Sequence, residues 1–154
     1  MRIFESIDAL TKAAGESLGV GEWHRVTQEQ VNQFAEATGD QQWIHTDPER
    51  AAQGPFGTTI AHGYLTLALL PLLMRSVYRV DGLAMAVNYG VNNVRFPAPL
   101  PVGARVRASA VLESVRPHRG GHQAVVKVTV EREGERRPVC VAETLVLLFS
   151  ATHS

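Results

Sequence analysis

The chain has 154 residues, 45% of them hydrophobic, and its fifteen basic and fifteen acidic side chains give zero formal charge. This length and apolar content suit one domain, residues 1–154, with a buried core. The charge balance gives no overall field for nucleic acid or an anionic membrane. The most apolar stretch, 65–73, is too short to span a membrane, and the lone Cys140 excludes an intramolecular disulfide or a cysteine metal cluster. With no signal-like start, a cytoplasmic protein is expected.

The first part of the chain predicts helices separated by glycines. Residues 3–14 carry Phe4, Ile7 and Leu10 on one helical face and end at Gly15, and residues 22–26 read as a brief strand. Thr27-Gln28-Glu29-Gln30 has the form of a capping box, which predicts a helix that ends at Gly39.

Two further helices are expected before the strand-rich second half of the chain begins. Asp47 and Pro48 suit the N-cap and first turn of a short helix through Gln53. Residues 63–78 are apolar on nearly all sides, which predicts a buried central helix. Pro71 lacks the N–H that would bond to Leu67, so this helix should bend there.

The second half predicts antiparallel strands. Valine-rich segments separated by proline or glycine turns are expected over 85–96, 104–115, 122–133 and 138–149. Val126, Val128 and Val130 alternate with polar residues, as in a strand with one wet face. Helices followed by a meander indicate an α+β fold in which the antiparallel sheet wraps a long apolar helix.

Two candidate catalytic residues, Asp40 and His45, lie between the helix expected to end at Gly39 and the helix expected to start at Asp47. Asp40 follows the helix-ending Gly39, and His45 precedes the Asp47-Pro48 helix start, so both are expected on an irregular segment pinned at its ends. Gly63 opens the central helix, where the first N–H groups lack intrahelical partners. Taken separately, Asp40 suits a turn residue and His45 a structural hydrogen-bonding group. Their spacing relative to the helix start favours catalysis instead.

The pattern Gly-Asp-x-x-x-x-His-x-x-x-x-x-Ala at Gly39, Asp40, His45 and Ala51 resembles the hydratase-2 motif of the MaoC-like (R)-specific enoyl-CoA hydratases and 3-hydroxyacyl-thioester dehydratases. Residues 61–63 and 88–103 extend the resemblance over nearly the whole chain. Where the family often has Asn-Pro, this chain has Gln42-Trp43. The resemblance implies a single hot-dog domain.

The resemblance also implies an activity, a lyase reaction of fatty acid metabolism. A trans-2-enoyl thioester of coenzyme A or of an acyl carrier protein is reversibly hydrated to the (R)-3-hydroxyacyl thioester, without a metal or redox cofactor. Asp40 and His45 would activate the water, and the Gly63 N–H would stabilise charge on the thioester oxygen. The implied assembly is a homodimer, since two such sheets join edge to edge.

Further substrate-binding residues are expected around this site: Ala61, His62, Trp43, Tyr89, Gly90, Asn93 and Arg95. His62 has two interpretations, substrate contact or a structural bond that fixes the turn. Arg105 and Arg107, with Arg95, are candidates for carrier phosphates. Two other functions remain open, a hot-dog acyl-CoA thioesterase and a non-catalytic acyl-thioester binding module.

Overall fold

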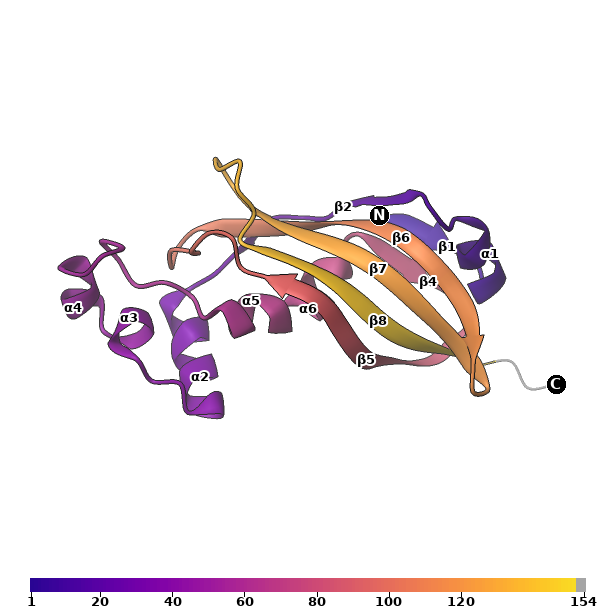
Figure 1. The fold of residues 1–154 in the computed structure, drawn as a ribbon, viewed down its shortest axis with the longest axis horizontal. Coiled ribbons are helices and arrows are strands. Elements are labelled where there is room, and N and C mark those ends of the chain that lie inside the picture. The colour runs from indigo at the N-terminus through magenta and orange to yellow at the C-terminus, as the bar shows by residue number, and fades with distance from the viewer. Residues whose placement is uncertain (152–154) are drawn as a thin grey trace.

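A computed structural model describes residues 1–151, so the last three residues of the expected domain lie outside the described part (Figure 1). The helices are α1 (Ile7–Lys12), α2 (Gln28–Thr38), α3 (Trp43–Thr46), α4 (Pro48–Ala52), α5 (Gly63–Ala68) and α6 (Leu70–Met74). The strands are β1 (Arg2–Phe4), β2 (Ser17–Val20), β3 (His24–Arg25), β4 (Tyr78–Val80), β5 (Leu83–Arg95), β6 (Arg105–His118), β7 (Gly121–Arg132) and β8 (Cys140–Ser150). None of the helices in this part of the chain is long and apolar enough to cross a membrane.

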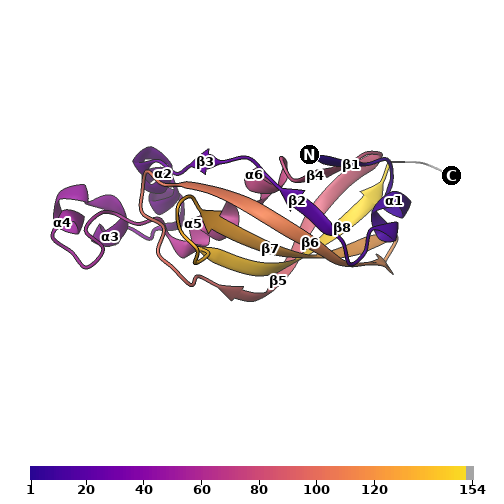
Figure 2. The same cartoon turned by 90° about the horizontal axis from the view of Figure 1, so that it is seen from above.

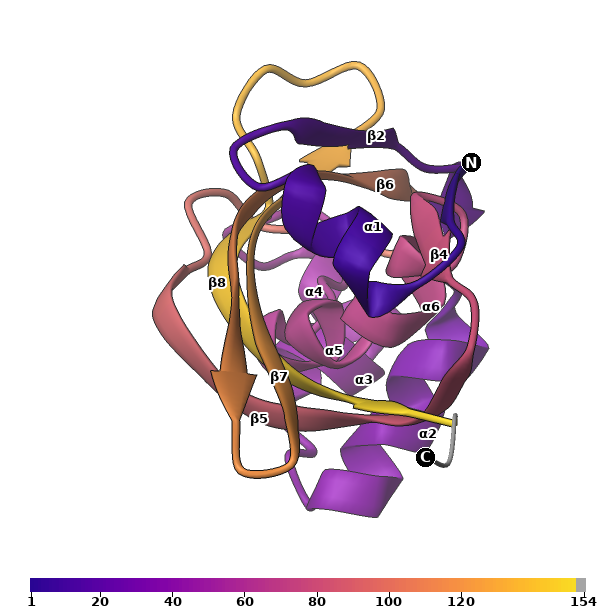
Figure 3. The same cartoon turned by 90° about the vertical axis from the view of Figure 1, so that its right-hand side faces the viewer.

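The main sheet is antiparallel, in the order β2-β6-β7-β8-β5, and β3 also pairs with β6. Viewed from one end, the sheet curves around α5 and α6 (Figure 3). Figure 2 shows α3 and α4 beyond one end of the sheet and α1 near the other. This arrangement is the α+β hot-dog fold expected from the sequence.

The alternation in β7 produces the expected two faces. Val126, Val128 and Val130 are buried, whereas Lys127 and Thr129 between them are exposed. The buried valines join one hydrophobic core with apolar residues of α5 and α6. Removal of these valine side chains from water stabilises the packing of the sheet against the helices.

The central helix is interrupted rather than merely bent. It forms α5 and α6, separated at Leu69, because Pro71 has no N–H to donate to Leu67. The helical segment ends at Met74, not at residue 78, since Tyr78 already belongs to β4.

The N-terminal prediction was also partly wrong. Residues Arg2–Phe4 form β1, which pairs in parallel with β4, and the helix begins only at Ile7, where the Ser6 hydroxyl accepts from the Ala9 N–H at 3.1 Å. The strand β2 was missed because Gly19, at φ +109°, interrupts its alternation. Phe4, Ile7 and Leu10 are nevertheless buried, as their spacing predicts.

Candidate active site

The end of α2 sets the position of Asp40. Gly39 adopts a left-handed conformation, φ +83°, and its N–H bonds to the Ala35 carbonyl at 2.9 Å. An L-residue rarely adopts this conformation, so glycine is required for the chain to turn here. Asp40 leaves the helix at this turn and is half-buried.

His45 lies on the single-turn helix α3, which corrects the expectation of an irregular segment. Its side chain is buried, with 6% exposed, and its Nδ1 lies 2.7 Å from the Ile60 carbonyl oxygen. A carbonyl only accepts, so Nδ1 carries the hydrogen. In the neutral ring the lone pair is therefore on Nε2, which makes that atom the basic nitrogen of the ring.

His62 packs directly against His45. The two rings are stacked, with centroids 3.9 Å apart and planes at 23°. His62 is 2% exposed, and its Nε2 donates to the main-chain carbonyl of Asp40 at 3.0 Å. These contacts favour the structural interpretation of His62, because its ring ties the Asp40 turn to the start of α5.

Ligand-type atoms of Asp40, His45 and His62 all lie within 4.8 Å of one another. An imidazole lone pair lies in the plane of its ring, so two nearly parallel rings do not direct their lone pairs at one ion. The stacking therefore disfavours a metal held by both histidines. The same separation suits one water molecule that hydrogen-bonds to the carboxylate and to a ring nitrogen.

A cavity of about 320 Å³ opens beside His45. It is lined by His45, Phe56, Ile60, Ala61, Gly63, Thr66, Phe96, Ala98, Pro99, Leu100 and Val139. The structure thus brings the predicted residues Ala61 and Gly63 to the same space as His45. Most of the lining is apolar, and the polar exceptions are His45, Thr66 and the backbone of Gly63, as in small-molecule sites generally.

Phe96 lines the cavity but was not among the binding residues predicted from the sequence. A Cβ atom at position 63 would lie 2.8 Å from the Phe96 ring, so the ring packs against Gly63 itself. Tyr64 contacts the same ring edge-on at 6.3 Å between centroids. Phe96 follows the end of β5, directly after the predicted Arg95, and only the fold shows that it faces the cavity.

Other predicted binding residues lie away from this cavity. Trp43 packs against Gly54 and under the Arg50 guanidinium, 4.4 Å from its ring, and does not line the cavity described above. Tyr89 and Gly90 line a separate cleft of about 430 Å³ beside α5 and α6.

The end of β5 also differs from the expectation. Asn93, at φ +53°, lies where the strand register shifts and faces a cleft that includes Lys127 and Glu143. The exposed Arg95 donates to the carbonyl of its neighbour Val94 at 2.7 Å. A strand alternates its faces, and a register shift changes that alternation, so adjacency in the motif did not bring these side chains together.

Two arginines suggested for carrier phosphates are already paired. Arg105 lies 2.5 Å from Glu133, Arg107 bonds to Glu131, and both guanidinium groups lie over the Trp23 ring. Their charge is therefore compensated within the outer face of the sheet.

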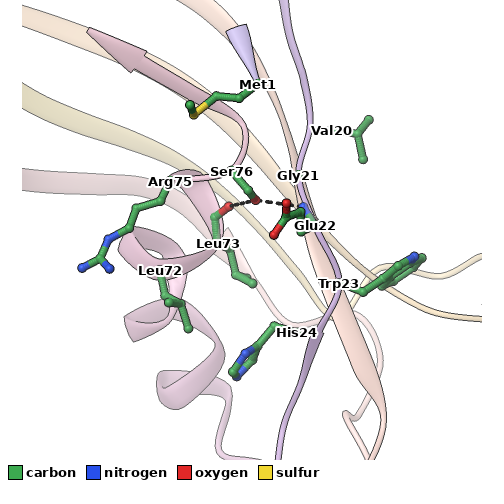
Figure 4. Close-up of a pocket in the computed structure, with 10 residues that line it drawn as sticks. All are labelled: Met1, Val20, Gly21, Glu22, Trp23, His24, Leu72, Leu73, Arg75 and Ser76. Atoms are coloured by element: carbon green, nitrogen blue, oxygen red, sulfur yellow. Dashed lines mark hydrogen bonds between the residues drawn. The ribbon is translucent and has the colours of Figure 1, made fainter. Parts of the chain in front are cut away.

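A larger cavity, about 560 Å³, lies between the β2–β3 segment and α6 (Figure 4). Its central polar group, the Ser76 hydroxyl, accepts from the Glu22 N–H at 2.8 Å and donates to the Leu73 carbonyl at 3.1 Å. Asp40 lines neither this cavity nor the smaller one, but His45 lines only the smaller one of the two. The smaller cavity beside His45 is therefore the better candidate for catalysis.

The chain is similar to known proteins over most of its length. The MaoC-like domain family matches residues 9–134. The chain is 60% identical over 147 residues to 3-hydroxyacyl-thioester dehydratase Z of Mycobacterium tuberculosis, covering 95% of this chain and 97% of the relative. It is 44% identical over 138 residues to nodulation protein N of Rhizobium leguminosarum bv. viciae, covering 87% and 85%.

Solved structures share the fold. The MaoC-like dehydratase from Rhodospirillum rubrum superposes with a TM-score of 0.71 at 23% identity, covering 92% of this chain and 95% of that one. The (R)-hydratase from A. caviae superposes with a TM-score of 0.69 at 24% identity, covering 86% and 94%. The matched length, the identity to curated relatives and the shared architecture lead to one conclusion, that this chain belongs to the MaoC-like domain family.

Proposed function

We propose that the protein catalyses the reversible hydration of a trans-2-enoyl thioester to the (R)-3-hydroxyacyl thioester. The observation that carries this proposal is the fixed tautomer of His45, whose Nδ1–H is held by the Ile60 carbonyl. A carboxylate oxygen of Asp40 and a ring nitrogen of His45 lie within 4.8 Å of each other, and we infer that Asp40 holds a water which gives its proton to the basic Nε2. A relative at 60% identity is named a 3-hydroxyacyl-thioester dehydratase, which supports the same reaction class.

The proposed reaction needs only proton transfers. The Asp40–His45 pair takes one proton from water as its oxygen bonds to C3 of the enoyl group. The C2–C3 double bond becomes an enolate, and the pair returns one proton to C2. Positioned acid–base groups of this kind contribute about 10²–10⁴ in rate.

The enolate charge resides largely on the thioester oxygen. Gly63 begins α5, so its N–H has no partner within the helix, and it lines the cavity together with His45. We assign this N–H as the oxyanion donor, a contribution of roughly 10²–10³ in rate. The apolar lining would align the acyl group, which adds the orientation that acid–base groups alone do not supply.

The proposed assembly is a homodimer joined along β5. This strand pairs only with β8 in the described residues and exposes Met85, Val87, Tyr89 and Val91, each by 41% or more. An open apolar edge is an aggregation hazard unless it is covered. Pairing with a second β5 would cover the edge and enclose the cleft beside Tyr89.

Crotonyl-CoA tests the reaction. We expect loss of the enoyl-thioester absorbance without release of free thiol, and the product should not be oxidised by an (S)-specific 3-hydroxyacyl-CoA dehydrogenase. Release of thiol would instead identify a thioesterase. No change with crotonyl, octenoyl and longer enoyl thioesters would indicate a binding module.

A further inference from the structure

Gln28, the first residue of α2, makes contacts that the reaction as described does not use. Its Nε2 donates to the main-chain carbonyl of His45 at 2.7 Å and to the Asn32 side chain at 2.9 Å. Its Oε1 accepts from the Thr59 hydroxyl at 2.6 Å. The half-buried amide therefore joins α2 to two segments that are distant in sequence.

The Thr59 side of this bridge leads back to the same histidine. Thr59 is 3% exposed, and its carbonyl accepts from the Val102 N–H at 2.9 Å, which anchors it beside the sheet. The next residue, Ile60, holds His45 Nδ1 through its carbonyl, and its own N–H donates to Ile44 at 2.9 Å. The ring of His45 is thus held by the Ile60 carbonyl, next to Thr59, and its main-chain carbonyl is held by the Gln28 amide.

We propose that Gln28 and Thr59 are positioning residues for His45. The pair fixes the position of the one-turn helix α3 relative to the Ile60 carbonyl, which keeps Nδ1 as donor and Nε2 as base. This proposal rests on the proposed function for its catalytic consequence. Neither residue is among those that line the cavity in residues 1–151, so both act through His45 and not on the substrate.

The chemistry of the bridge requires an amide at position 28. The group must donate to a carbonyl on one side and accept from a hydroxyl on the other, and the glutamine amide does both through two separate atoms. A glutamate has the same shape but no hydrogen for the His45 carbonyl. A glutamate in the first turn of a helix also interacts favourably with the helix dipole, which offsets the bond to Asn32 that Gln28→Glu removes within α2.

Four single variants test the bridge. Gln28→Glu removes the two bonds that Nε2 donates, to the His45 carbonyl and to Asn32, and Thr59→Val removes the bond to Gln28, each at nearly constant volume. Thr59→Ser keeps the hydroxyl, and Gln33→Glu makes the same charge change at an exposed position of α2. We expect kcat to fall roughly 10-fold to 100-fold in the first two, as for a displaced catalytic group, with KM nearly unchanged. Thr59→Ser and Gln33→Glu should retain wild-type kcat. The double variant Gln28→Glu/Thr59→Val should lose little more than either single variant, because both break one unit.

A second readout does not depend on activity. In the wild-type protein the Nδ1–H of His45 should give a slowly exchanging imidazole proton signal in NMR, assigned by its absence in His45→Gln. Gln28→Glu and Thr59→Val should broaden this signal or speed its exchange with water, whereas Thr59→Ser should preserve it.

The two readouts distinguish the possible failures. A wild-type protein that does not hydrate enoyl thioesters, but whose His45 signal responds as expected, would overturn the function and leave the positioning role standing. An unchanged His45 signal in Gln28→Glu and Thr59→Val, with kcat at the wild-type level, would overturn the positioning role. A loss of kcat that simply follows a lowered folded fraction, measured by circular dichroism, would also overturn it.

Discussion

Asp40 is positioned by the glycine that ends α2, and His45 is positioned by the one-turn helix α3. Their side chains nevertheless bring ligand-type atoms within 4.8 Å of each other. We expect Asp40→Asn and His45→Gln each to lower kcat by at least about 10². The two losses should not add, because in the proposed mechanism both groups hold the same water. Steady-state kinetics on enoyl thioesters checks this, with far-UV circular dichroism as the measure of folding.

Asp47→Asn is the matched control for Asp40→Asn. Asp47 is an exposed carboxylate seven residues later whose side chain accepts from the Arg50 N–H at 3.1 Å, and asparagine caps equally well. Its kcat should therefore stay at the wild-type level. If Asp40→Asn or His45→Gln retained more than about half of the wild-type kcat with an unchanged spectrum, the assignment of the pair would be wrong.

Gly63 combines a free N–H with a close contact to Phe96. A side chain added by Gly63→Val would meet the Phe96 ring, which is 38% exposed and can move outward. We therefore expect kcat/KM to fall by roughly 10² or more, with a melting temperature lower by only a few degrees.

The double variant Gly63→Val/Phe96→Ala separates the two roles of Gly63. It makes room for the new side chain, but valine still stands beside the N–H. We expect melting temperature to recover while kcat/KM remains low. Recovery of kcat/KM to that of Phe96→Ala alone would show that Gly63 serves only packing.

The N-cap hydrogen bond at the start of α2 should contribute measurably to the stability of the protein. The exposed Thr27 hydroxyl accepts from the Gln30 N–H at 3.2 Å, while the Gln30 side chain lies 3.1 Å from His24 and so does not complete the reciprocal box. Thr27→Ala should lower the free energy of unfolding by about 1 kcal/mol. Urea titration at fixed protein concentration measures this.

Thr27→Ser is the control for this cap, because it keeps the accepting oxygen and removes only a methyl group. Its unfolding midpoint should stay near that of the wild type. An equal loss in both variants would show that the methyl group, and not the hydrogen bond, is what stabilises α2.

The expected homodimer forms when the unpaired edge of β5 pairs with the same edge of a second copy. Val87→Lys places a charge on each copy where two β5 strands would meet, and like charges across such an interface are unfavourable. We expect multi-angle light scattering at micromolar concentration to give twice the chain mass for the wild type and the chain mass for this variant.

Val20→Lys is the matched control for the edge. Val20 is 55% exposed on β2, at the opposite edge of the same sheet, so the change in charge is identical. Its mass should equal that of the wild type. A fully active wild-type monomer would refute the proposed dimer.

Features determined by a few neighbouring residues could be predicted from the sequence. The left-handed turn at Gly39, the caps at Thr27 and Asp47, and the alternation of Val126 to Val130 depend on local backbone geometry and on which side chains are apolar. These features were enough to predict an α+β fold with an antiparallel sheet, and the family resemblance carried by the motif of Asp40 and His45 added the hot-dog architecture.

Only the tertiary structure decided which distant groups meet. The stacking of His62 on His45, the Phe96 ring against Gly63 and the bridge from Gln28 to Thr59 each join segments from different elements. Such contacts depend on how distant elements pack together and, at the end of β5, on a register shift, which no local pattern encodes. For the same reason the residues of β5 named from the motif lie apart from the cavity, while their neighbour Phe96 lines it.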